Sequence, residues 1–181
     1  MASNTKNVKL GVCRVYFGNE EEDLGYTKGG VDVSIATETH EVTVDQLGNT
    51  PINEYITART AEVTIPLAET TLENAVKIMP GAKLVTDAED TKKRYVDVPT
   101  GCGLSLMNFA QKLRLHPIAN AEDNLEDDFV LFRAATPGQI DYSYNLDEER
   151  IFSCTFKGYP DEQGKLFALG DTTAMASGSS L

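Results

Sequence analysis

The sequence contains few of the residues that carry catalysis or hold metals. Its two histidines, His40 and His116, have no Cys and no second His at metal-ligand spacing, so a zinc site is not expected. No Lys-Ser/Thr pair follows the glycines at phosphate-loop spacing, and no nucleophile elbow is present. The acidic stretch at 122–128 lacks the central glycine and terminal glutamate of an EF-hand loop. We therefore expect no enzyme activity, no metal and no cofactor.

Cysteine and tryptophan are also scarce. Three cysteines, Cys13, Cys102 and Cys154, are too few and odd in number for a disulfide framework, which fits a reducing cytoplasm. Cys13 and Cys154 lie among alternating apolar residues, which favours buried thiols. The absence of Trp counts against a carbohydrate-binding module, because such modules usually stack sugars on exposed aromatic rings.

Long apolar runs and an excess of positive charge are both missing. No window approaches the roughly 20 apolar residues of a membrane span, and the first residues do not form a signal peptide. We expect a chain that stays in the cytoplasm after synthesis and does not bind membranes. Its 28 acidic residues outnumber 16 basic ones, for a net charge of −12. Tight wrapping of nucleic acid is not expected, because that binding needs Lys and Arg to neutralise phosphates.

What the sequence does contain is the alternation typical of β-strands. Val31, Val33 and Ile35 alternate with polar residues, which predicts a strand from 31 to 38 with one buried face. The same pattern in Val63, Ile65 and Leu67 predicts a second strand. Helical turns at 104–112 are expected to run into another strand. Further strands are predicted at 8–17, 95–98, 129–134, 140–146, 152–156 and 166–169, with the last two forming a hairpin.

One helix is predicted at about 70–80. Thr70 and Glu73 fit a capping box before apolar residues at helical spacing, and Pro80 with Gly81 ends the helix. About eight short strands and one helix favour a mainly β protein, a sandwich or barrel with a flanking helix and long inter-strand loops. We expect a single domain over 1–170 and a flexible tail over 171–181.

The connection from about Thr37 to Tyr55 is predicted to be a long loop. It is polar, carries the turn residues Gly48, Asn49 and Pro51, and includes at most a short strand around 42–44. Loops of this length are uncommon in a compact domain unless they have a function. Its apolar side chains would gain little from exposure in an isolated subunit. The connection is therefore a candidate contact surface.

Several segments resemble the major tail tube protein of long, non-contractile bacteriophage tails. In chain order they are GYTKGGVDV, EVTVDQLGNTPI, VTIPLAETTLENAVKIMPGA, LRLHP, FRAATPG and FKGYPDEQGKLFALGD. Together they cover most of the chain. The resemblance implies a β-sandwich-like subunit that assembles into six-membered rings, which stack into a hollow tube for DNA. It also implies localisation in the virion after assembly in the host cytoplasm.

The resemblance assigns roles to two groups of residues. The long connection would contact the next ring, through Val42, Val44, Asp45, Gln46, Leu47, Asn49, Ile52 and Tyr55. The polar face of the strand at 31–38 is small and acidic, which suits the wall of an aqueous channel; its residues are Asp32, Ser34, Ala36 and Glu38. A wall of like charge would let DNA slide rather than bind.

The implied partners are other copies of this chain, a tape measure protein inside the tube, and tail tip and terminator proteins, with DNA only in transit. Three alternatives remain open. The same subunit fold would serve the tube of a contractile tail or a secretion-type injector. A carbohydrate-binding β-sandwich would share the fold class. An unrecognised hydrolase would need a concave site with a perturbed acid or base.

Overall fold

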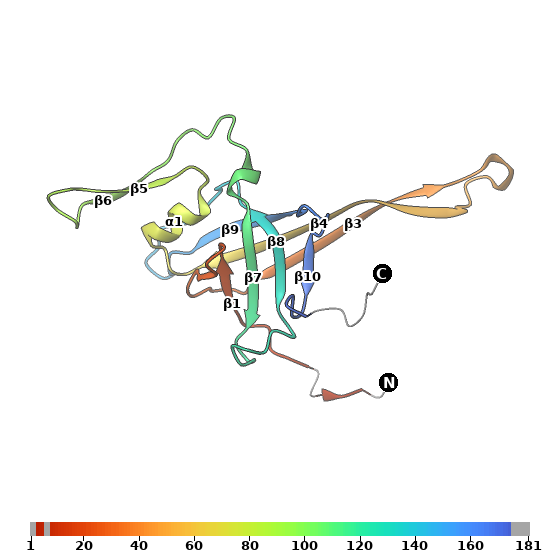
Figure 1. Cartoon of the computed structure of the whole chain (residues 1–181), viewed down its shortest axis with the longest axis horizontal. Coiled ribbons are helices and arrows are strands. Elements are labelled where there is room, and N and C mark those ends of the chain that lie inside the picture. The colour runs from red at the N-terminus through yellow and green to blue at the C-terminus, as the bar shows by residue number, and fades with distance from the viewer. Residues whose placement is uncertain (1–2, 6–7, 175–181) are drawn as a thin grey trace.

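The computed structural model describes residues 3–5 and 8–174 and shows a mainly β protein, as predicted (Figure 1). Its main antiparallel sheet bends into two layers at β8 (Phe129–Ala135), which pairs with different strands along its length. The first half of β8 pairs with β10 (Phe167–Leu169), whereas its last three residues pair with β9 (Phe152–Tyr159). One layer therefore contains β1 (Cys13–Phe17), β2 (Glu22–Asp23), β7 (Gln111–Pro117), β8 and β10. The other contains β9, β4 (Asn53–Leu67) and β3 (Asp32–Val42).

The hydrophobic core lies between these two layers. Val63, Ile65 and Leu67 of β4 are fully buried, which confirms the predicted alternation. Phe17 of β1 meets Phe156 of β9 across the core, with ring centroids 4.9 Å apart. Each such side chain contributes about 1.5–3 kcal/mol by leaving water.

Helix α1 (Leu72–Ile78) confirms the predicted helix but begins one residue later than expected. The cap is Thr71, whose hydroxyl accepts a hydrogen bond from the backbone N–H of Asn74 at 3.2 Å. The hydroxyl of Thr70 instead accepts from the guanidinium of Arg150, at 2.7 and 2.9 Å. Asn74 is buried and donates to two backbone carbonyls, which fastens the helix start to the sheet.

The predicted loop at 37–55 is wrong in form, because 37–42 and 53–55 are paired strands and only 43–52 connect them. β3 pairs with β4 out to Val42 and Asn53, whereas β9 pairs with β4 only through Glu62–Leu67. Residues 36–60 therefore form a two-stranded ribbon that projects from the sheet, here called the arm (Figure 1). At about 3.3 Å per residue the paired strands of the arm extend roughly 25 Å. Neither face of the arm is buried, so its strands need no sustained alternation of apolar and polar residues, and the sequence predicted only short pieces of them.

The buried face predicted for the strand at 31–38 is confirmed only at Val31, which packs against the core, and is wrong for the two apolar residues after it. Val33 and Ile35 are 41% and 43% exposed. β3 is an edge strand, and within residues 3–5 and 8–174 no second layer covers this part of it. The apolar face that forms the core at β4 thus continues outward onto β3 without a covering layer.

Other boundaries differ from the predictions in smaller ways. The first strand begins at Cys13 rather than at residue 8. Residues 140–146 make only the bridge between Asp141 and Ser153, and β10 pairs with β8 instead of forming a hairpin with β9. The 3-10 turn η3 (Leu106–Phe109) runs into β7 as predicted. A small separate hairpin follows α1, and its first strand, β5 (Lys83–Thr86), was not predicted, whereas its second, β6 (Arg94–Asp97), was.

The polar tail predicted at 171–181 lies largely outside the described residues. Only 171–174 are described, and they are exposed.

We expect Thr71→Ala to lower the free energy of unfolding by about 1 kcal/mol, because it removes the hydroxyl that caps α1. Thr71→Ser keeps the hydroxyl and should retain most of the stability. Urea unfolding followed by circular dichroism measures this, with Thr91→Ala in the exposed β5–β6 turn as the control. Equal stabilities for Thr71→Ala and Thr71→Ser would contradict the cap assignment.

Candidate functional site

The four residues predicted to line a channel share one exposed face of the sheet. Directly opposed residues in an antiparallel pair lie on the same face. Asp32, Ser34, Ala36 and Glu38 of β3 oppose Thr64, Glu62, Thr60 and Ala58 of β4. β9 continues the same face with Ser153, Thr155 and Lys157. Because Val63 and Ile65 point into the core, this set points away from it.

This polar face carries small and acidic side chains across three strands. Its three carboxylates are Asp32, Glu38 and Glu62, and its one ammonium, Lys157, lies 3.3 Å from Glu62. Among the described residues, Asp32 and Glu38 have no cation within 4 Å. The hydroxyls of Thr64 and Thr155 hydrogen-bond at 3.0 Å between β4 and β9. The face is thus polar and net negative.

The eight residues predicted to contact another ring all gather at the outer end of the arm. Val42 and Tyr55 lie at the ends of the two strands, and the 3-10 turn η2 (Asp45–Leu47) lies between them. Residues 43–52 are called the tip below. The backbone N–H of Ile52 donates to the carbonyl of Val42 at 2.8 Å, which closes the tip. Leu47 and Ile52 are 57% and 51% exposed, so the tip presents apolar groups to solvent.

The outer part of the arm, residues 38–58 and here called the outer arm, carries acidic side chains that no Lys or Arg of the same stretch balances. Residues 38–58 contain four carboxylates and no Lys or Arg. Glu41 and Glu54 lie directly opposite each other in the ladder, an arrangement that is destabilising by up to about 1 kcal/mol. An external cation would relieve this repulsion.

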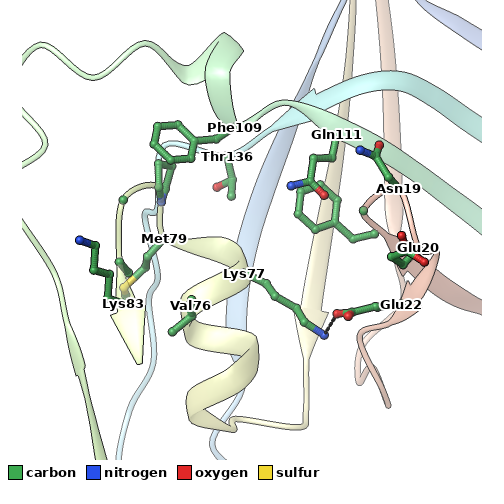
Figure 2. A pocket seen from close by; sticks show the side chains of 15 residues that line it. Asn19, Glu20, Glu22, Val76, Lys77, Met79, Lys83, Phe109, Gln111 and Thr136 are labelled. Atoms are coloured by element: carbon green, nitrogen blue, oxygen red, sulfur yellow. Dashed lines mark ion pairs between the residues drawn. The ribbon is translucent and has the colours of Figure 1, made fainter. Parts of the chain in front are cut away.

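A cavity of about 610 Å³ lies beside α1, between the β1–β2 turn and η3 (Figure 2). Its apolar lining includes Phe17, Val76, Met79, Pro80 and Phe109. At its rim, Lys77 pairs with Glu22 at 2.6 Å, as the dashed line in Figure 2 marks. Lys83, from β5, also lines the cavity and has no acidic partner within 4 Å in the part of the chain that is described. Sequence reasoning missed this cavity, because its walls come from segments far apart in the chain.

A buried ionic network on β7 was also missed. Arg114 donates to Asp128 at 3.0 Å and to Glu21 at 2.7 Å, and Nδ1 of His116 lies 2.7 Å from Asp128. Arg114 also stacks on Tyr16, 4.3 Å from the ring centroid. The available signal was the alternation in LRLHP, where Arg114 and His116 share the strand face opposite Leu113 and Leu115.

The network stabilises charges that burial would otherwise disfavour. Burial works against the Arg114 cation, but hydrogen bonds to Asp128 and Glu21 outweigh it and raise the pKa of the guanidinium. The hydrogen bond from Lys112, together with Arg114, lowers the pKa of Glu21. Glu21 has a φ of 51°, a backbone conformation that non-glycine residues rarely adopt. The network therefore holds the β1–β2 turn, and with it one wall of the cavity.

The His116–Asp128 pair is buried, with side chains 2% and 1% exposed. Nε2 of His116 is buried and has no hydrogen-bond partner among the described residues. A general base must reach the proton that it abstracts, and this nitrogen faces no described acceptor or donor. Within residues 3–5 and 8–174 no group of three or more His, Cys, Asp or Glu side chains is arranged to hold a metal. The described helices include none with the length and apolar character needed to cross a bilayer.

Comparison with known proteins finds a distant likeness among solved structures. No family model and no curated protein matches the sequence. Among solved structures, a chain of the "Virion of native gene transfer agent (GTA) particle" is similar, with 12% sequence identity and a TM-score of 0.41. The alignment covers 88% of this chain and 96% of that one.

We expect Asp128→Asn to lower the free energy of unfolding by about 3 kcal/mol, because it removes the buried carboxylate that pairs with both Arg114 and His116. Asp127→Asn is the matched control: Asp127 pairs with Lys9 at the surface, and its loss should cost less than about 1 kcal/mol. Urea unfolding of both variants at neutral pH measures the difference. Equal losses would show that the buried network does not stabilise this layer.

Proposed function

We propose that this chain is the tube subunit of a long, non-contractile, phage-type tail, and that it acts by assembly rather than by catalysis. The observation that carries the proposal is the open edge of β3. This strand has eleven residues, an unpaired outer edge, a polar face on one side and the exposed Val33 and Ile35 on the other. A long free edge is a liability in a monomer. Pairing with neighbouring copies around a closed ring would remove it.

Ring closure would also cover the apolar face that the subunit leaves open. The core face of β4 continues onto β3 at Val33 and Ile35, where no second layer lies over it. A neighbouring subunit placed there would complete the core. The opposite face of β3, β4 and β9 would then face the ring axis.

The polar face suits a channel through which DNA passes. Three carboxylates against one ammonium give each copy a net negative wall, and the sequence resemblance implies six copies per ring. DNA carries one charge per roughly 1.7 Å of axis, so a wall of like sign would not retain it. The proposed partners are other copies of the chain, a tape measure protein within the tube, and tip and terminator proteins. The proposed location is the virion, after assembly in the host cytoplasm.

Negative-stain electron microscopy of the concentrated chain tests assembly directly. We expect hollow tubes or stacked rings from the natural sequence. Ile35→Asp should abolish them without changing the unfolding midpoint, because the partly exposed side chain adds little to the isolated core. Leu146→Asp, at a fully exposed loop position, is the control and should still assemble. Tubes from Ile35→Asp as abundant as those of the natural chain would contradict the role of the β3 edge.

Thiol labelling tests which face lines the channel. In a Cys102→Ser background, we expect Ser34→Cys to react with a bulky maleimide in free subunits but at least about tenfold more slowly in end-capped tubes. The native Cys13 and Cys154 should not react with the maleimide, because burial raises the pKa of both thiols, that of Cys154 to about 12.

Ala88→Cys, in the exposed β5–β6 turn, is the matched control for access of the maleimide to a thiol. Equal labelling of Ser34→Cys in free subunits and in capped tubes would place the polar face outside the channel.

A further inference from the structure

We propose that the cavity beside α1 receives the arm tip of another copy of this chain, so that copies join head to tail. The inference deepens the proposed assembly and rests on it for the identity of the partner. It adds the receiving site, which the sequence did not reveal.

The tip and the cavity lie at opposite ends of the subunit. Figure 1 shows the arm projecting at one end of the long axis, with α1 and the β5–β6 hairpin at the other. A tip therefore cannot fill the cavity of its own chain. Contact between two different surfaces of identical subunits is heterologous and propagates from copy to copy. That is the geometry needed for stacking.

The two surfaces are complementary in their apolar groups. The tip exposes Leu47 and Ile52, which an isolated subunit leaves in water. The cavity presents Val76, Met79 and Phe109 and has a volume in the range that accepts inserted side chains. Burying the tip there would cover apolar surface on both copies.

The two surfaces also offer one complementary charge pair, within a cavity lining in which Glu20 and Glu22 balance Lys77 and Lys83 overall. The outer arm carries Glu41, Asp45 and Glu54 with no Lys or Arg between residues 38 and 58, and Glu41 and Glu54 repel each other. The cavity offers Lys83, whose ammonium has no acidic partner within 4 Å among the described residues. An inserted tip would bring Asp45 toward this lysine.

The receiving surface is held in shape before any partner arrives. Lys77 and Glu22 bridge α1 and β2 across the rim. Glu21, next to the rim residues Glu20 and Glu22, is fixed by Lys112 and Arg114. A rigid receiving surface loses little conformational entropy when it binds.

Cross-linking tests the contact. In a Cys102→Ser background, Leu47→Cys is combined with Ala82→Cys, a cavity position, and treated with a short bismaleimide. We expect a ladder of covalent multimers on denaturing gels, since each link joins two copies and each copy carries both positions. Leu47→Cys with Ala88→Cys is the matched control and should give at most a weak ladder. Ala88 lies at the same end of the subunit as the cavity but does not line it.

Electron microscopy of the same samples separates this inference from the proposed function. Tubes without a ladder would overturn the cavity assignment and leave the tube function standing. A ladder without tubes would support the contact and count against the tube. Absence of both would reject both. A ladder from Leu10→Cys with Ala82→Cys, and none from Leu47→Cys, would assign the cavity to the segment before β1 instead.

A charge exchange gives a second readout. Asp45→Lys and Lys83→Asp should each weaken association by about fivefold at low salt, and the double variant should recover most of it. Lys92→Asp, in the β5–β6 turn, is the control and should associate normally. A double variant no better than the weaker single variant would overturn the pairing of Asp45 with Lys83.

Discussion

The strict two-residue period of β4 is the constraint on which the rest of the structure depends. Val63, Ile65 and Leu67 must face the core, so Glu62 and Thr64 must face away from it. Pairing extends this rule to β9 on one side and to β3 on the other. The residues that alternate with the core side chains therefore form one polar face across β3, β4 and β9. The proposed channel wall follows from this strand period, and only the choice of small and acidic residues is specific to it.

The same strand also links the core to the arm. β4 is fastened between β9 and β3 near Ile65, and beyond Ala61 only β3 accompanies it. The inner half anchors the ribbon, while the outer half holds exposed groups at a fixed distance from the sheet. A flexible loop of equal length would lose more conformational entropy on contact with another copy. A ribbon with one fixed register is therefore better suited to a repeated contact.

The ionic network around Arg114 anchors the cavity at the other end of the subunit, as β4 anchors the arm. Arg114, Asp128 and His116 lie on the outer face of the first layer and connect β7 to the loop before β8. Through Glu21 they also position the β1–β2 turn at the cavity. Burying charges is costly unless they are paired, so these groups maintain one another only in this arrangement. Stability of the layer and the shape of the cavity depend on the same contacts.

The sequence by itself determined the mainly β class, the core positions of β4, helix α1 and the sharing of one face by Asp32, Ser34, Ala36 and Glu38. These follow from local periodicity and capping residues, which neighbouring positions encode. Only the tertiary structure decided that 37–55 is a ribbon, that Val33 and Ile35 lack cover, that β10 joins β8, and that Lys83 and Phe109 meet at one cavity. Each of these depends on which distant segments pack together, and a residue's pattern along the chain does not say what lies opposite it.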